Sequence, residues 1–250
     1  MLFLKFALRL PYRQKEGVAR ETFRELGIKI PNFRTLYYRL SKGEFCLKEF
    51  AQVEELPQDF VIVLDSSGLK VTNRGEWLRR RCGKRARKGW IKIHVAFDLG
   101  SKQVVELEVT DERTPDCKKA IELVKGVKEK AEKKERRIKK VIADAGAGYD
   151  THEFFRYLGK EKIESAVMVR RGAKIRGNPY RDRVIRAIRR GKRKWKESVG
   201  YGKRWLVEGF FSSFKRWFGE YVSSVRFENI RKELVFKVAI ANMFLAMSSG

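Results

Sequence analysis

The pattern of apolar and polar positions predicts a sheet whose strands alternate with helices. Residues 60–65 and 138–144 are apolar runs that each end in an aspartate, which is typical of strands buried on both faces. Residues 91–98 and 104–109 alternate between apolar and polar positions and predict a hairpin. Residues 115–135 have helical spacing, so the chain passes from strand to helix to strand. Such a crossover makes the two buried strands parallel and indicates an α/β fold.

The aspartates that end the two buried runs are candidate functional residues. Asp65 precedes Ser-Ser-Gly and Asp144 precedes Ala-Gly-Ala-Gly, so each is expected where a strand gives way to a turn. A carboxylate at the end of a buried strand needs hydrogen bonds or a cation, and ligands of such sheets bind beyond the carboxyl ends of the strands. We therefore expect Asp65 and Asp144 to share a site. Asp98 is expected to stabilise the hairpin turn, and His94 to be a strand residue without a ligand role.

A stripe of polar residues follows one side of the helix predicted at residues 201–215. At about 100° per residue, Tyr201, Arg204, Glu208 and Lys215 fall within an arc of about 60°. Apolar side chains occupy the neighbouring side, so this helix is expected to lie along the core with its polar stripe at the margin. A lone Arg204–Glu208 pair would indicate only a solvated helix surface. Four residues on one stripe favour a functional face.

The spacing of these four residues resembles a known signature. Tyr-x2-Arg-x3-Glu-x6-Lys is typical of the DDE transposases of prokaryotic insertion sequences, and Tyr201, Arg204, Glu208 and Lys215 match it at every position. The resemblance implies a ribonuclease H-like mixed sheet flanked by helices over residues 56–250. It also implies that Tyr201, Arg204 and Lys215 contact DNA at the transposon end.

By the same resemblance, Asp65, Asp144 and Glu208 are the catalytic, metal-binding carboxylates. Three converging carboxylates repel one another unless divalent cations neutralise them. Mg²⁺, with Mn²⁺ as a substitute, is the implied cofactor, since it prefers oxygen ligands. The implied reaction cuts DNA strands at the ends of an insertion sequence and joins the 3′ ends to target DNA through two metal ions.

One part of the sequence departs from the pattern of that family. The family commonly places a Tyr-Asp pair very soon after the second catalytic aspartate. Here Tyr149 and Asp150 follow an additional Ala-Gly stretch. We therefore assign the second ligand to Asp144 and keep Asp150 as the alternative.

The N-terminal residues predict a separate helical segment. Two helices, within residues 14–26 and 33–40, are separated by Gly27 and Pro31 and indicate a small helix-turn-helix-like segment over residues 1–50. Its second helix would present Arg34 and Arg39 to DNA. The alternative is a small helical subdomain without base contacts.

Charge indicates a polyanionic partner. The chain carries 58 Lys and Arg against 31 Asp and Glu, a net charge of +27. Basic tracts at residues 74–88 and 170–196 include aromatic residues, a composition suited to phosphates with occasional stacking. Basic residues are spread along the chain and not gathered on one amphipathic segment, which disfavours a membrane partner.

Double-stranded DNA, both element ends and target, is thus the expected partner, with a homodimer in the synaptic complex. The expected location is the cytoplasm, associated with the nucleoid. Two other classes remain open: a ribonuclease H-like metal-dependent nuclease without strand joining, and a catalytically inactive DNA-binding relative. The first would cut without joining, and the second would only bind.

Overall fold

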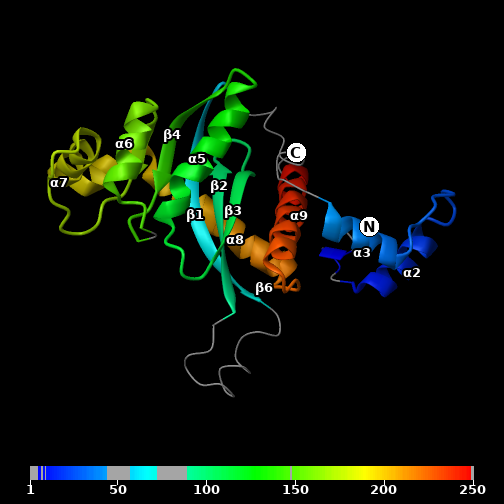
Figure 1. Ribbon diagram of the computed structural model, residues 1–250. Coiled ribbons are helices and arrows are strands. Elements are labelled where there is room, and N and C mark those ends of the chain that lie inside the picture. The colour runs from blue at the N-terminus through cyan, green and yellow to red at the C-terminus, as the bar shows by residue number, and fades with distance from the viewer. Residues whose placement is uncertain are drawn as a thin grey trace, which may run out of the picture.

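The computed structural model describes residues 5, 6, 8, 10–43, 57–71, 89–146 and 148–248. Within them, six strands form one mixed sheet (Figure 1). In chain order the strands are β1 Asp59–Val71, β2 Trp90–Asp98, β3 Val104–Asp111, β4 Arg137–Ala143, β5 Glu164–Val167 and β6 Tyr221–Val222. Their spatial order is β3-β2-β1-β4-β5, with β6 paired to the far end of β1.

The strand directions follow from the connections. β2 pairs antiparallel with β3, as the predicted hairpin requires, and also with β1, whereas β4 runs parallel to β1 and β5 parallel to β4. The crossover between β3 and β4 contains helix α5, Cys117–Glu132. Antiparallel hairpin strands followed by parallel crossover strands confirm the expected ribonuclease H-like mixed sheet.

Strand β1 is longer than the sequence predicts. Its pairing with β4 ends at Val63 and Ile142, but its pairing with β2 continues to Lys70. The Ser-Ser-Gly stretch after Asp65, expected as a turn, is therefore extended strand. Residues 66–70 pair with β2, which the local pattern of small residues does not reveal.

Helices cover both faces of the sheet. α5 lies in front of it and α8 behind it in Figure 1. α9 lies against the β3 edge, where the Asn242 side chain accepts a hydrogen bond from Val104 N at 2.9 Å and donates one to Val104 O at 2.8 Å. The remaining helical bounds are α6 His152–Lys160, α7 Pro179–Val199, the 3₁₀ turn η3 Tyr201–Arg204, α8 Trp205–Phe218 and α9 Phe227–Met247.

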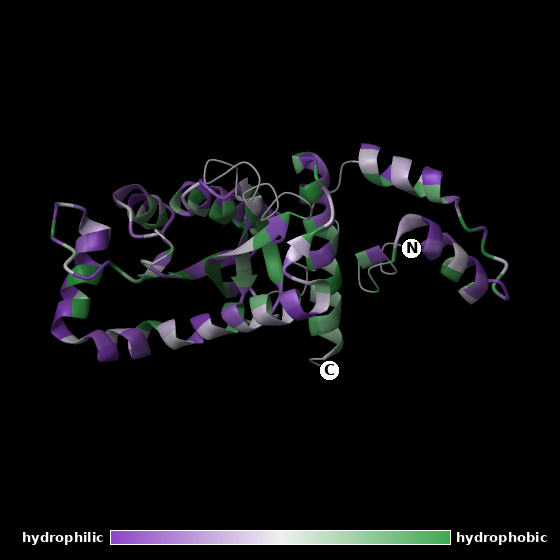
Figure 2. Ribbon diagram, turned by 90° about the horizontal axis from the view of Figure 1, so that it is seen from below, coloured by the Kyte–Doolittle hydropathy of each residue, from purple (hydrophilic) through white to green (hydrophobic). Residues whose placement is uncertain are grey.

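The core joins the sheet to an aromatic side of α8. Phe210, Phe214 and Phe218 are buried along this helix, with successive ring centroids 5.7 and 5.1 Å apart, and Phe210 reaches Phe97 of β2 at 5.7 Å. The expected apolar side of the helix is thus confirmed. Figure 2 shows hydrophobic residues concentrated in the sheet and α9, and hydrophilic residues predominating along α7.

The two predicted N-terminal helices are present as α2, Tyr12–Thr22, and α3, Phe33–Lys42. The Glu16 carboxylate of α2 accepts a hydrogen bond from Phe33 N at 2.7 Å, and Asn32 caps the first turn of α3. Phe6 stacks on Phe236 of α9 with centroids 5.8 Å apart. The helix-turn-helix function of this segment stays a prediction.

The predicted basic tract at residues 74–88 lies outside the described residues. Among the helices that the structure does describe, none has both the length and the apolar character needed to cross a membrane.

Candidate active site

Asp65 and Asp144 lie at the edge where two parallel strands separate. Asp144 directly follows β4, and Asp65 lies on β1 two residues beyond the last β1–β4 pair. Because β1 and β4 run in the same direction, this edge is the carboxyl end of β4 and the point at which its pairing with β1 ends, although β1 itself continues. Ser66 N donates to Asp65 Oδ1 at 3.0 Å. Burial raises the pKa of Asp65, an effect partly opposed by that amide and by the positive charge of Arg204.

Arg204 connects Asp65 to Glu208. Its Nη1 lies 3.5 Å from Asp65 Oδ2, and its Nη2 donates to Glu208 Oε1. Burial would lower the pKa of Arg204, but Asp65, Tyr201 and Glu208 raise it above its ordinary value. The guanidinium thus lies between two of the three expected carboxylates and compensates part of their negative charge.

Asp144 joins the same cluster through Tyr201. Tyr201 OH donates to Asp144 Oδ1 at 2.9 Å, and the Tyr201 ring packs on Trp195 with centroids 5.8 Å apart. Burial and then this hydrogen bond raise the pKa of the phenol. In this structure the Tyr201 hydroxyl therefore holds a carboxylate, while its predicted contact with DNA remains a prediction.

The signature residues do not lie on one continuous α-helix, which corrects the sequence prediction. α7 ends at Val199, and the next residue, Gly200, has a φ of 69° in the left-handed region that glycine tolerates. Tyr201 and Arg204 then occupy the 3₁₀ turn η3, and α8 begins at Trp205. Residues three apart eclipse each other in a 3₁₀ turn, so Tyr201 and Arg204 still share one side.

Lys215 is not part of the Arg204 cluster. It lies seven residues after Glu208 on α8, about 10 Å farther along the helix axis. Its side chain is half-buried, and within the part of the chain that the structure describes it makes no hydrogen bond or ion pair. The side chain is therefore available to an external anion.

Asp150 is already fully engaged by the protein. Arg181 Nε and Nη2 donate to its two carboxylate oxygens at 2.6 and 2.9 Å, and Arg170 N donates to Oδ2 at 2.9 Å. The Asp150 side chain is 1% exposed. This bidentate ion pair occupies both carboxylate oxygens of Asp150 and supports the choice of Asp144.

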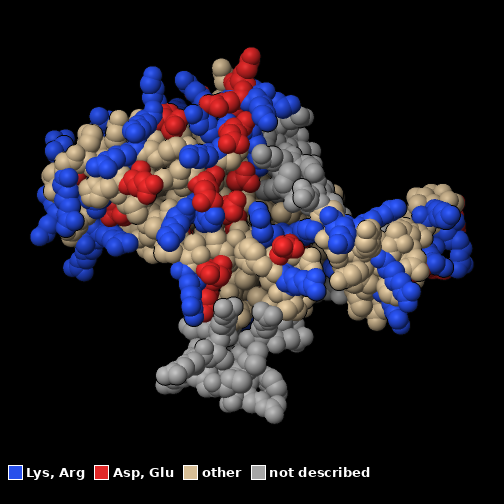
Figure 3. All heavy atoms as spheres, in the orientation of Figure 1, with Lys and Arg blue, Asp and Glu red and all other residues tan. Residues whose placement is uncertain are grey.

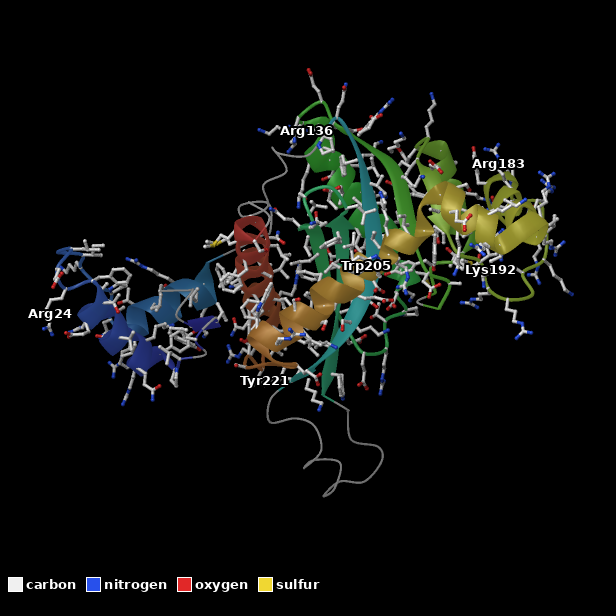
Figure 4. The ribbon with its side chains drawn as sticks, turned by 180° about the vertical axis from the view of Figure 1, so that it is seen from behind. Arg24, Arg136, Arg183, Lys192, Trp205 and Tyr221 are labelled. Atoms are coloured by element: carbon white, nitrogen blue, oxygen red, sulfur yellow. The ribbon has the colours of Figure 1, made fainter. Side chains whose placement is uncertain are left out.

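A groove with basic residues borders the cluster. Its lining includes Lys196, Lys203, Arg204 and Glu208, together with Trp205, whose surface is 64% exposed. Figure 4 shows Trp205 on the face that α8 covers and Lys192 farther out on α7. The groove lies between Glu208 and the C-terminal end of the basic helix α7.

The structure also shows where the remaining predicted residues of the N-terminal segment and the hairpin lie. Arg34 and Arg39 are exposed on α3. Asp98 accepts from Ser101 N at 2.6 Å and from Ser101 Oγ at 2.9 Å, so its expected role in the turn is confirmed. His94 is a buried residue of β2, as predicted.

Sequence reasoning missed Asp116, which lies on the α5 side of the sheet. Asp116 is buried and accepts hydrogen bonds from Ser66, the neighbour of Asp65, and from Lys92. The only signal in the sequence was its position at the start of the helix predicted over residues 115–135, which suggests an ordinary helix cap.

The comparison with known families agrees with the geometry. Residues 57–243, which include the whole sheet and every residue of the cluster, match the family described as Transposase DDE domain. The chain belongs to this family. The prediction of a DDE transposase is therefore confirmed at the level of the family, and the prokaryotic insertion-sequence group stays a prediction.

Two solved structures are similar to this DDE transposase domain at low identity. A chain of the simian T-cell lymphotropic virus intasome in complex with PP2A regulatory subunit B56 gamma aligns at 13% identity and a TM-score of 0.31, over 70% of this chain and 56% of that one. The Drosophila P element transposase strand transfer complex aligns at 12% identity and a TM-score of 0.35, over 89% and 60%. This chain thus spans less than two thirds of either.

The donor set of the DDE transposase domain fits the divalent cations that the family implies. Asp65, Asp144 and Glu208 offer only carboxylate oxygens, which suit Mg²⁺ and Mn²⁺, and the side chain of Glu208 is 53% exposed. Among the described residues, no three Asp, Glu, His or Cys side chains are arranged as ligands of one ion. Arg204 supplies the positive charge between Asp65 and Glu208.

Proposed function

We propose that this protein is an insertion-sequence transposase of the prokaryotic group that carries the Tyr-Arg-Glu-Lys signature. It cuts DNA strands at the ends of the element and joins the 3′ ends to target DNA. The observation that carries the proposal is the Arg204 guanidinium, which holds Asp65 of β1 and Glu208 of α8 beside the carboxyl end of β4. Family membership supports the same reaction class.

The carboxylates are assigned to metal binding and the cations to DNA. Asp65, Asp144 and Glu208 would hold two Mg²⁺ ions, with Mn²⁺ as a substitute. Bound there, such ions activate the attacking oxygen and stabilise the leaving oxygen of an in-line displacement. Tyr201 orients Asp144 through its hydroxyl. Arg204 and Lys215 hold the phosphates next to the scissile bond. Tyr201 lies beside the DNA strand that these two cations hold.

The surface charge supports a double-stranded DNA partner. Lys and Arg side chains are concentrated over α7 and over the N-terminal helices, whereas acidic side chains are concentrated over α5 (Figure 3). Phosphate contacts made by such surfaces position a duplex, and base contacts select its sequence. We assign selection of the element ends to Arg34 and Arg39 of α3, and we assign a homodimer to the synaptic complex.

The assignment of the carboxylates predicts the behaviour of three variants. Asp65→Asn, Asp144→Asn and Glu208→Gln should each abolish cleavage of end DNA, because each removes a metal-binding charge. DNA binding should persist, since none of the three contacts phosphate. The assay incubates labelled end DNA with a plasmid target and Mg²⁺ or Mn²⁺, and measures nicking, joining and binding separately.

The same assay separates the rival functions. Nicking without joined products in the wild-type protein would indicate a nuclease, and binding without nicking would indicate an inactive relative. A variant that still cuts would remove its residue from the site.

A further inference from the structure

A buried polar network lies on the opposite face of the sheet from Arg204. Ser66 of β1 pairs with His94 of β2. Ser66 Oγ donates to Asp116 Oδ2 at 2.7 Å, and Lys92 Nζ donates to Asp116 Oδ1 at 3.1 Å. Asp116 directly precedes α5, which covers this face (Figure 1). One carboxylate therefore joins strands β1 and β2 to the start of α5.

The Asp116 side chain is used in an unusual way for its position. An aspartate just before a helix normally accepts hydrogen bonds from the first amides of that helix. Asp116 makes no such cap bond. Its two oxygens bond to the sheet, and Lys92, which compensates the buried charge, also donates to Thr114 O at 3.0 Å. The Asp116 side chain thus bonds to the strands and does not cap the helix.

This network reaches Asp65 through one residue. The Ser66 amide donates to Asp65 Oδ1 on one face, while the Ser66 hydroxyl is held by Asp116 on the other. The β1–β4 pairing has ended before Asp65, so this stretch of β1 pairs with β2 alone until β6. The bond to Asp116 limits rotation of the backbone where the support of β4 is missing.

The His94 ring packs behind the Asp116 carboxylate. It is fully buried, its Nε2 lies 2.8 Å from Thr110 Oγ1, and its Nδ1 lies 3.7 Å from Asp116 Oδ1. The Asp116 carboxylate is therefore enclosed by β2 on one side and bonded to β1 on the other. Its position is determined by packing as well as by hydrogen bonds.

We propose that Asp116 is a positioning residue for Asp65 and acts through Ser66, whose amide orients the Asp65 carboxylate toward the metal ions. The inference rests on the proposed function, in which Asp65 is a metal ligand. Groups that orient a ligand change metal affinity or activity by about 10- to 100-fold when they are removed.

The test compares variants that break or keep the bond between Ser66 and Asp116. Ser66→Ala and Asp116→Leu break it, whereas Ser66→Thr and Asp116→Asn keep a hydroxyl donor and an oxygen acceptor. Thr151→Ala is the matched control, because it removes a hydroxyl that accepts from Phe154 N at 3.2 Å and caps α6. Four quantities are measured: Mn²⁺ affinity of the free protein by electron paramagnetic resonance, single-turnover cleavage, end-DNA affinity and melting temperature.

The two disrupting variants should weaken Mn²⁺ binding and slow cleavage by about 10-fold or more, with end-DNA affinity unchanged. Ser66→Thr and Asp116→Asn should retain most of the Mn²⁺ affinity and most of the cleavage rate. The double variant Ser66→Ala with Asp116→Leu should be no worse than either single one, since both remove the same bond. Thr151→Ala should lower the melting temperature alone.

The inference is overturned if Ser66→Ala keeps wild-type Mn²⁺ affinity and cleavage, or if Ser66→Thr is impaired as strongly as Ser66→Ala. Asp65→Asn is measured in the same series to keep the two proposals apart. If Asp65→Asn abolishes Mn²⁺ binding and cleavage while Ser66→Ala behaves like Thr151→Ala, only the positioning role is wrong. If Asp65→Asn retains both, the proposed function fails and this inference fails with it.

Discussion

Arg204 is the residue that distinguishes a functional stripe from an ordinary helix surface. The sequence left open a solvated pair between Arg204 and Glu208. In the structure Arg204 is 22% exposed and also reaches Asp65, which is 139 positions away in the chain. A surface pair at i,i+4 would have no such third member. Arg204 and Glu208 therefore belong to the strand-end cluster, which also contains Asp65, Asp144 and Tyr201.

The phosphate contacts of the stripe can be counted from salt dependence. Arg204→Ala and Lys215→Ala should each reduce the slope of log affinity for end DNA against log salt by about 0.9 per lost contact. Cleavage should fall as well. The measurement is a titration of end DNA at several salt concentrations. Arg216→Ala, an exposed neighbour of Lys215 on another side of α8, controls for loss of any positive charge.

Slopes that stay parallel to wild type, with normal cleavage, would show that neither cation contacts DNA. The spacing match to the signature would then have no functional meaning for these two positions. A reduced slope in Arg216→Ala alone would place the DNA on a different side of α8.

Asp150 is expected to matter for stability and not for the reaction. Asp150→Ala leaves Arg181 buried without its partner, and breaking such a pair costs about 3–5 kcal/mol. For a chain of this size the melting temperature should fall by about 10 °C. Glu208→Gln, at an exposed position, should leave the melting temperature close to wild type. Normal melting with loss of cleavage would instead place Asp150 in the site.

At the scale of elements, α3 is the candidate for recognising the element ends. Arg34→Ala with Arg39→Ala should reduce the preference for end DNA over random DNA, because both side chains are exposed on this helix and base contacts carry selection. Non-specific affinity should fall less. The measurement is competition between the two DNAs. Arg24→Ala, an exposed cation beyond α2, is the matched control.

An unchanged preference in the double variant would favour the alternative of a small helical subdomain without base contacts. An equal fall with Arg24→Ala would indicate that the N-terminal segment contributes only charge. Either result would leave the strand-end cluster unaffected, since α3 contributes no residue to it.

At the scale of the whole molecule, the positive charge should lower the stability of the free protein and favour its binding to DNA. The net charge is +27, so the excess Lys and Arg side chains repel one another in the free protein. Raising salt from about 0.1 to 1 M shortens the screening length from about 10 to 3 Å, so the free protein should melt at a higher temperature. Each kcal/mol of relieved repulsion raises the melting temperature by about 2–4 °C. DNA affinity should fall over the same range.

The prediction is checked by melting curves at several sodium chloride concentrations, with and without end DNA. The stabilisation that DNA gives should shrink as salt rises, since the complex depends on phosphate contacts. A melting temperature of the free protein that is flat or falls with salt would mean that its charges are already compensated within the fold.

The sequence by itself determined the buried strand segments that lead to Asp65 and Asp144, the crossover between them and the face shared by Tyr201, Arg204 and Glu208. These features follow from backbone periodicity, which is local. It could not show that β1 continues past Asp65 or that a 3₁₀ turn precedes α8, because pairing with β2 and the end of α7 decide both.

Only the tertiary structure decided which group bonds to each of these carboxylates. Tyr201 bonds to Asp144 across 57 positions, and Arg181 takes up Asp150 across 31. Asp116, which reads as a helix cap, turns to a strand 50 positions earlier. Such contacts depend on packing of distant elements against one sheet. The spacing of residues along the chain does not contain that information.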